Sequence, residues 1–255
     1  MAKNGESSIV TKCANMVDIL ALAQRPLSFS ELANRSGLVK SSAHRILAVL
    51  LSERLASFDE DTKTYALGSR SLTWAKSYLR LSNLPTIADR YFDEFCQRSG
   101  MNGALSVRDR GDVLYLRTYN PLPVKIASLA GDRAPLHCTA AGKVFLAYQE
   151  ETKKNELLAN INYQAFTEFT IKDSATLDAE LHKVRAAGFG TAIQEEVFQV
   201  LGIAAPIFGE HQEVLAAVSL WSQIDRISPS EVLKFSESLI GIAARMSLDH
   251  SSGKI

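Results

Sequence analysis

The apolar positions of the first 70 residues follow helical spacing and then give way to short extended segments. The pattern predicts a helix over residues 8–22 and two shorter helices that meet at Ser36-Gly37, where glycine permits a tight left-handed turn. Ser30 with Glu31 is the predicted cap of the first short helix, and Ser41 or Ser42 that of the second. The second short helix would turn four apolar side chains to the core: Ala43, Ile46, Leu47 and Leu50.

A strand at residues 56–58, a polar turn at 59–63 and a strand at 64–67 follow these helices. Two helices and a hairpin in this order predict a winged helix-turn-helix, which offers a helix to the DNA major groove. A solvated helical hairpin is the simpler alternative, and Arg45 could instead turn inward and brace the unit. The candidate DNA contacts are Lys40, Ser41, Ser42, His44, Arg45 and Lys63.

The pattern predicts a connecting helix over residues 71–82 that stops before Leu84-Pro85, because the residue before proline disfavours helix. We therefore expect a DNA-binding domain over 1–70, a linker over 71–84 and a second domain over 85–255. Further expected elements are helices at 86–98, 139–148, 152–159 and 177–187, strands at 105–108, 113–117, 124–129, 200–208 and 214–221, and a long final helix from about 225–230.

Hairpin strands interspersed with helices predict an α+β second domain with a mostly antiparallel sheet. Helices over one face of that sheet would leave the other face for a ligand or a second subunit. The 255 residues are 46% hydrophobic and 22% charged, which is typical of a soluble globular protein.

The formal net charge is zero, so the whole chain carries no basic signature for nucleic acid. Residues 1–70 hold nine Lys or Arg against seven Asp or Glu, a balance of only +2. Because phosphate contacts dominate affinity, specific binding needs well-placed cations and two DNA-binding units per complex. No apolar run approaches the roughly 20 residues of a membrane span, and no signal peptide is visible. We expect a cytoplasmic protein without a membrane partner.

Three motifs resemble the IclR family of bacterial transcriptional regulators. They are G-L-V-K-S-S-A-H-R-I-L at residues 37–47, G-D-R-A-P-L-H-C-T-A-A-G-K at 131–143 and I-A-A-P-I-F at 203–208. Matches in family order extend over about residues 8–248. The resemblance implies a winged helix-turn-helix, a helical linker and a GAF-like C-terminal α/β domain that binds a small effector. It also implies homodimers, often paired into homotetramers.

The chain departs from the family pattern near the hairpin and around the expected effector pocket. Arg54 and Gln199 stand where the family usually has glycine. Ala192 stands near an often acidic position, Gly202 replaces a common Cys or Ser, and Trp221 replaces the second Ser of an S-x-S strand. We expect Arg54 to alter the entry into the wing and the others to alter the effector class.

The effector site is expected where a helix with small residues opens at Thr139, since free backbone N–H groups there favour an anionic or carbonyl group. The small residues could instead only let the helix pack on the sheet. Ser219 and Trp221 lie two apart on one strand and share a face, although Trp221 could be simple core. Glu195 and Glu196 could provide a functional carboxylate or order their loop through backbone N–H groups. The candidate effector-binding residues are Leu129, Thr139, Ala140, Ala141, Gly142, Glu195, Ser219 and Trp221.

His137 and Cys138 suggest a metal site or a cysteine nucleophile, but no second ligand pair and no base stand at a suitable spacing. Three scattered cysteines do not indicate a disulfide framework, and we expect neither a metal nor a cofactor. Lys143 is expected at the surface or in a salt bridge.

These patterns predict a ligand-responsive regulator that binds double-stranded operator DNA and senses a small organic acid or aromatic metabolite. The resemblance implies that it is a repressor of a catabolic operon. The alternatives are a small-molecule-binding GAF-like enzyme with an accessory helical domain, and a dimeric adaptor whose winged helix binds protein.

Overall fold

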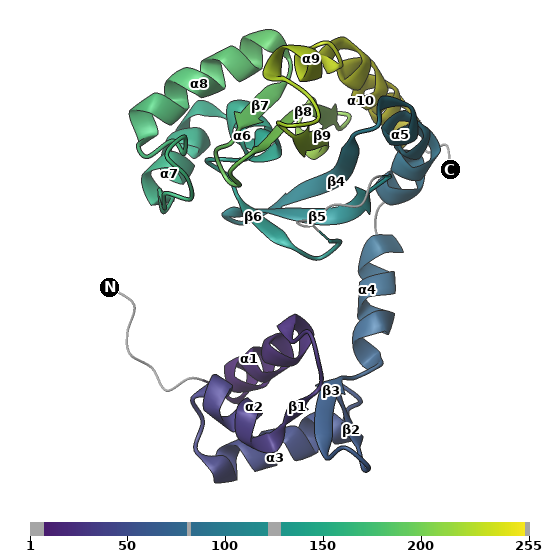
Figure 1. Cartoon of the computed structure of the whole chain (residues 1–255), viewed down its shortest axis with the longest axis vertical. Helices are drawn as coiled ribbons and strands as arrows, with labels where there is room; N and C mark the ends of the chain where they lie inside the picture. The colour runs from purple at the N-terminus through teal and green to yellow at the C-terminus, as the bar shows by residue number, and fades with distance from the viewer. Residues whose placement is uncertain (1–7, 81–82, 122–128, 253–255) are drawn as a thin grey trace. The chain divides into compact units, whose positions relative to one another are not determined.

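The computed structural model describes residues 8–80, 83–121 and 129–252, and the chain divides into two compact units, Met1–Leu81 and Ser82–Ile255 (Figure 1). Each unit has its own sheet and its own buried apolar cluster. None of the helices within these ranges is long and apolar enough to cross a membrane.

The first unit is a helix-turn-helix with a small sheet. The sheet has the order β1-β3-β2 and is antiparallel, with Phe58 opposite Tyr65. The predicted winged helix-turn-helix is therefore confirmed. Strand β1 was not predicted, because its two residues are too few to show an alternation of apolar and polar positions. The elements are α1 (Ile9–Leu22), β1 (Leu27–Ser28), α2 (Phe29–Ser36), α3 (Lys40–Ser52), β2 (Ala56–Asp59), β3 (Thr64–Leu67) and α4 (Arg70–Arg80).

The core of this unit contains the four α3 side chains that the pattern predicted, Ala43, Ile46, Leu47 and Leu50, all buried. Gly37 follows α2 with a φ of 66°, and its N–H donates to the carbonyl of Asn34. Glycine adopts this left-handed conformation without steric cost, which is why α2 and α3 can join in a tight turn.

Both predicted helix caps of this unit were wrong. Ser28, not Ser30, caps α2: its hydroxyl accepts from the Glu31 N–H, and the Glu31 carboxylate accepts from the Ser28 N–H at 2.9 Å. This capping box requires a serine three positions before the glutamate, a spacing that Ser30 does not have. The cap residue of α3 is Val39, so neither Ser41 nor Ser42 caps it.

The second unit is an α+β domain around a six-stranded antiparallel sheet of order β6-β5-β4-β9-β8-β7. The predicted fold class is confirmed. The elements are α5 (Leu84–Ser99), β4 (Asn102–Asp109), β5 (Asp112–Tyr119), β6 (Arg133–Pro135), α6 (Ala140–Ala147), α7 (Glu151–Asn160), α8 (Ser174–Ala187), β7 (Gly190–Ile193), β8 (Val200–Phe208), β9 (Val214–Gln223), α9 (Pro229–Leu233) and α10 (Ser236–Ser251).

Several boundaries differ from the prediction. The short strands β6 and β7 were missed, and the final helix is divided into α9 and α10 around Lys234 and Phe235. Helix α5 begins at Leu84 because Pro85 suits the first turn, where its missing N–H costs nothing. The predicted strand 124–129 lies outside the described residues except for Leu129.

Helices cover both faces of the large sheet, contrary to the expectation of one free face (Figure 1). Helix α6 packs on the face that carries Ala204 and Ala217. Helix α5 packs on the opposite face, where Gly103 leaves room for Phe92 and Cys96. Helix α10 contacts both α5 and β8.

Candidate functional site

Helix α3 presents a polar face opposite its buried stripe. Lys40, Ser41, His44 and Arg45 are exposed, and Ser42 is half-buried. The exposure of Arg45 excludes the alternative in which it turns inward. The His44 ring packs edge-on against Phe29 at 5.9 Å, which holds the imidazole near the start of α2. The arrangement offers cationic and hydroxyl groups on one surface, as major-groove contact requires.

Lys63 lies exposed at the end of the β2–β3 turn, with a φ of 54°. Its ammonium lies 2.9 Å from Glu60 and 5.9 Å from the centroid of the Phe58 ring. Both partners are exposed, so the ion pair is weak and leaves the cation available to a phosphate. The turn itself is ordered by Asp59, whose carboxylate accepts from the N–H groups of Asp61 and Thr62.

Arg54 connects α3 to the hairpin in a left-handed conformation, with a φ of 58°. Its carbonyl accepts from the Arg70 N–H at 3.1 Å and lies so close to Gly68 that a Cβ there would overlap it. A glycine would adopt this backbone freely, whereas arginine adopts it under strain of about 1 kcal/mol. The departure from the family pattern at this position thus has a local energetic cost.

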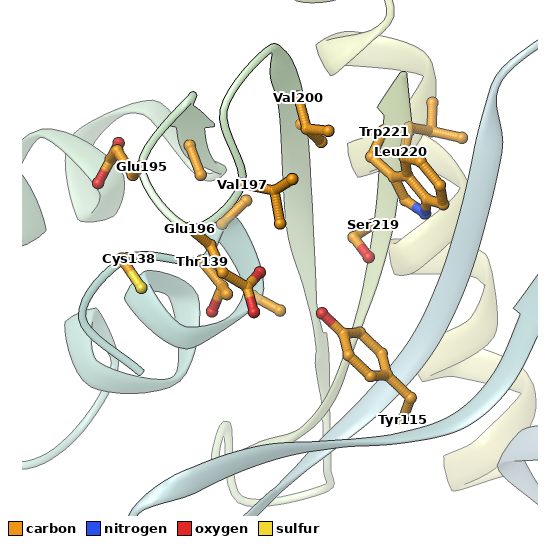
Figure 2. A pocket seen from close by; sticks show the side chains of 14 residues that line it. Tyr115, Cys138, Thr139, Glu195, Glu196, Val197, Val200, Ser219, Leu220 and Trp221 are labelled. Atoms are coloured by element: carbon orange, nitrogen blue, oxygen red, sulfur yellow. The ribbon is translucent and has the colours of Figure 1, made fainter. Parts of the chain in front are cut away.

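The second unit contains a cavity of about 90 Å³ between the start of α6, the β7–β8 loop and the sheet (Figure 2). A cavity of roughly 150 Å³ can hold a benzene ring, so this space suits a molecule of few atoms. It is lined by Tyr115, Cys138, Thr139, Ala140, Ala141, Ala192, Glu195, Glu196, Val197, Val200, Gly202, Ser219, Leu220 and Trp221.

Six of the eight predicted effector-binding residues lie together at this cavity: Thr139, Ala140, Ala141, Glu195, Ser219 and Trp221. Trp221 is half-buried and forms part of the wall, so it is not simple core.

Two predicted residues do not line the cavity. Leu129 is 60% exposed, and its N–H donates to Asp132. Gly142 faces the backbone of Leu136, where a Cβ would overlap the chain. The simpler interpretation, that a small residue lets the helix pack closely, therefore holds for Gly142. Sequence spacing could not separate packing from lining, since both call for small side chains.

The start of α6 lies in the cavity wall. Thr139 caps the helix: its hydroxyl accepts from the Gly142 N–H at 3.1 Å and donates to the Pro135 carbonyl at 2.7 Å. The amides of Ala140 and Ala141 lie in the first turn, at the positive end of the helix dipole. An anionic or carbonyl oxygen at this end of the cavity would be favoured by these dipoles.

The β7–β8 loop, residues 194–199, is held from outside the cavity. The hydroxyl of Thr167 donates to the Gln194 carbonyl at 2.6 Å, and that of Thr170 donates to the Glu195 carbonyl at 2.6 Å. Gln194 and Gln199 both have left-handed φ values, 59° and 62°. The loop therefore has a tight, well-bonded backbone that carries Glu196 and Val197 to the cavity wall.

Lys143 is a buried salt-bridge residue, 1% exposed, and not a surface lysine. Its ammonium donates to Glu195 Oε1 at 2.7 Å and to the Thr191 carbonyl at 2.9 Å, and Glu180 lies 3.9 Å away. Burial raises the pKa of Glu195, and Lys143 opposes that rise. Since Glu195 also accepts from the Ile193 N–H at 3.4 Å, it orders the loop, as one of the two interpretations of this residue expected.

Glu196 differs from Glu195 in having no such partner. Its carboxylate and the Tyr115 hydroxyl point into the same space, whereas the Glu195 side chain points away from it (Figure 2). Among the described residues, the Glu196 carboxylate makes no hydrogen bond or ion pair. Burial raises its pKa to about 7, because removal from water disfavours the charged form.

Cys138 and His137 do not form a catalytic pair. Burial raises the pKa of the Cys138 thiol, and the nearby Glu196 and Glu195 raise it further, whereas a nucleophile needs the opposite shift. The His137 Nε2 lies 3.1 Å from the Gln164 carbonyl, and its ring packs on Tyr163 and Phe166. Within the described ranges, no group of three or more His, Cys, Asp or Glu is placed to hold a metal ion.

The sequence interpretation missed several lining residues. Val200 and Gly202 could have been found from strand pairing, since Gly202 lies opposite Trp221 and side chains two apart share a face. Tyr115 reaches the cavity from β5, two strands away from β9, so no local pattern indicates it. Val197 and Leu220 were also missed. Ala192, Cys138 and Glu196 were considered in the sequence analysis, but not as predicted effector-binding residues.

A winged helix-turn-helix connected to a second domain with an internal cavity defines a ligand-responsive DNA-binding protein. Residues 10–60 match the IclR helix-turn-helix domain, and residues 76–248 match the bacterial transcriptional regulator IclR C-terminal domain. The chain therefore belongs to the IclR family of transcriptional regulators, which are not enzymes. Both alternatives, the enzyme and the protein-binding adaptor, are thereby set aside.

Relatives match nearly end to end. The chain is 30% identical to the glycerol operon regulatory protein of Streptomyces coelicolor, over 89% of this chain and 88% of that protein. It is 25% identical to the transcriptional repressor IclR of Escherichia coli, over 96% and 90%. An IclR homologue from Microbacterium hydrocarbonoxydans, solved in complex with 4-hydroxybenzoate, shares the fold with a TM-score of 0.79 at 21% identity, over 96% and 98%.

Proposed function

We propose that this chain is a repressor of a catabolic operon that acts in the cytoplasm and loses or changes its operator affinity when a small organic or aromatic acid binds. The observation that carries the proposal is the cavity between the first turn of α6 and the sheet, in a chain that also has a winged helix-turn-helix. The E. coli relative that is named a repressor supports the sign of regulation.

The DNA half of the proposal assigns α3 to the major groove. Lys40, Ser41, Ser42, His44 and Arg45 contact base edges and phosphates, and Lys63 reaches the backbone or the adjacent minor groove. Because the charge of the first 70 residues is only +2, one copy binds weakly. A homodimer, or a homotetramer built from two dimers, supplies two or more copies of α3 and reads paired half-sites.

The effector half assigns the acid group to the amides of Ala140 and Ala141. Trp221, Val197 and Val200 supply the apolar wall for the rest of the molecule, and Ser219 and Tyr115 supply hydroxyls. The homologue in complex with 4-hydroxybenzoate supports an acid as the effector, although an aromatic acid needs more room than the 90 Å³ of this cavity.

Regulation then follows from linkage. An effector that prefers one arrangement of the subunits shifts the population toward it, and a linker over residues 71–84, which includes most of α4, carries the change to the DNA-binding domains. One arrangement matches the half-site spacing and the other does not.

The test is binding to labelled DNA from upstream of this protein's own gene, with and without a panel of aliphatic and aromatic acids. We expect salt-sensitive binding that one acid changes by tenfold or more. If that DNA is not bound, selection from random sequences supplies the operator, and the same panel is applied. An operator affinity that no acid changes would overturn the effector half, and failure of the selection would overturn the DNA half.

A further inference from the structure

The charges around the cavity are unbalanced toward the negative. Glu195 and Glu196 both lie in its wall, and Glu180 lies behind Lys143. Lys143 is the cation of this group and is already engaged by Glu195. Among the lining residues, all of which the structure describes, there is no Lys, Arg or His. An acid effector would therefore add a further negative charge beside an unpaired carboxylate.

Two unpaired anions in one small cavity repel strongly. The helix dipole at Ala140 is equivalent to about half a charge and cannot neutralise both of them. One of the two carboxyl groups must then take up a proton. The effector's acid group is stabilised by the α6 amides, whereas Glu196 has no hydrogen bond or ion pair with any residue that the structure describes, so Glu196 is the group that is protonated.

We propose that acid effectors bind this protein with uptake of one proton from solvent by Glu196, whose neutral carboxyl group then donates a hydrogen bond inside the cavity. This inference rests on the proposed function, because it assumes an acid effector. It makes Glu196 a specificity-determining residue: the protonated form accepts acids, and the ionised form rejects them. No bond other than that to the proton forms or breaks.

The surroundings of Glu196 support this assignment. The titratable groups that line the cavity with it are Cys138, two residues before α6, Tyr115 on β5 and the neighbouring Glu195, whose side chain points away. Burial raises the pKa of the Cys138 thiol, which keeps it neutral, and Glu195 is held by Lys143. Burial already raises the pKa of Glu196 to about 7 in the empty protein, so protonation there costs little near neutral pH.

The competing ligand chemistry is a protonated amine, which would pair with ionised Glu196 and bind without proton uptake. The Lys143 ammonium, which would repel an amine, is paired with Glu195. Experiment therefore has to distinguish an acid from an amine as the ligand. The two chemistries predict opposite pH dependence, since an acid binds better as Glu196 gains its proton and an amine binds better as Glu196 loses it.

Calorimetry on the full-length protein tests the proposal with acetate, pyruvate, benzoate and 4-hydroxybenzoate as acids, benzamide as a neutral probe and benzylamine as a cation. Repeating each titration in buffers of different ionisation enthalpy gives the number of protons taken up. We expect acid affinity to fall about tenfold from pH 6 to pH 8, with proton uptake that approaches one at pH 8. Benzamide affinity should change less than about twofold over that range.

Glu196→Gln imitates the neutral carboxyl group. This variant should bind the acid about tenfold more tightly than the native protein at pH 8, with no proton uptake. Glu210→Gln, at an exposed glutamate outside the cavity, is the matched control and should behave like the native protein. An acid that binds with unchanged affinity and no proton uptake overturns this inference alone. Binding of benzylamine but of no acid, or of no probe to either protein, overturns the acid effector and this inference together.

Discussion

The ammonium of Lys143, on α6, lies 2.7 Å from Oε1 of Glu195, on the β7–β8 loop, and the lysine side chain is 1% exposed. This pair connects the helix whose first turn faces the cavity to the loop that carries Glu196. The same ammonium donates to the Thr191 carbonyl on β7, so three parts of the cavity wall share one cation.

Lys143→Met should destabilise the protein and weaken effector binding. Removing one member of a buried pair leaves the other charge uncompensated, which costs about 3–5 kcal/mol. Thermal unfolding and effector titration measure the two effects. Lys154→Met is the matched control, because Lys154 forms a similar pair with Asp178 at 2.8 Å and is 6% exposed, but its partner, unlike Glu195, does not line the cavity. We expect the control to lose stability and to keep its effector affinity; equal loss of affinity in both variants would contradict a local role for Lys143.

Glu196→Gln should stabilise the protein at neutral and higher pH. The folded carboxyl keeps its proton up to about pH 7, whereas the unfolded chain releases it near 4.5. The folded state therefore binds more protons in this window, and the free energy of unfolding falls as the pH rises through it. Denaturant unfolding at several pH values should show a difference between variant and native protein that is near zero below pH 4.5 and reaches about 1–3 kcal/mol above pH 7. A constant difference would contradict the raised pKa.

Trp221 should report effector binding by fluorescence. The chain has two tryptophans, Trp74, 53% exposed on α4, and Trp221 in the cavity wall. Trp74→Phe leaves Trp221 as the single emitter, and a bound effector displaces water from its indole and shifts the emission. Trp221→Phe serves as the reverse control. An effector that changes operator affinity but leaves the Trp221 emission unchanged would place the ligand elsewhere.

Lys40→Ala should weaken operator binding about equally for all sequences. A phosphate contact carries no sequence information, and its loss reduces the slope of log affinity against log salt by about 1. Binding titrations at four or more salt concentrations measure this slope. Lys172→Ala, an exposed lysine in the second unit, should change neither affinity nor slope. An unchanged slope for Lys40→Ala would remove Lys40 from the interface.

Arg54→Gly should stabilise the first unit. Arg54 holds a φ of 58°, and glycine adopts this conformation without the strain of about 1 kcal/mol. Part of the gain is offset because glycine gives the unfolded chain more conformational freedom. We therefore expect the free energy of unfolding, measured with denaturant, to rise by about 0.5 kcal/mol. Lys63→Gly, at a φ of 54° in the exposed turn, should gain a similar amount and also lose DNA affinity. A loss of stability in Arg54→Gly would mean that the arginine side chain makes a contact that outweighs the strain.

Local patterns predicted the first unit well. The buried stripe of Ala43, Ile46, Leu47 and Leu50 follows from helical spacing, and Gly37 follows from the needs of a tight turn. The predicted cap of α2 was wrong by two residues. A capping box needs the serine three positions before the glutamate, and Ser28, not Ser30, stands at that position relative to Glu31. The two-residue strand β1 was missed because it is formed by its pairing with β3 and has no pattern of its own.

The sequence by itself determined the winged helix-turn-helix, the antiparallel α+β second domain and the part of the cavity that lies on single elements, such as Thr139 on α6 and Ser219 with Trp221 on β9. Periodicity and capping act over a few residues, so they can be read along the chain. The tertiary structure alone decided that Tyr115 and Glu196 face the same space and that Lys143 pairs with Glu195. It also left Glu196 without a cation among the residues that line the cavity. Those outcomes depend on which strands and loops pack together, and burial and charge pairing are properties of that packing.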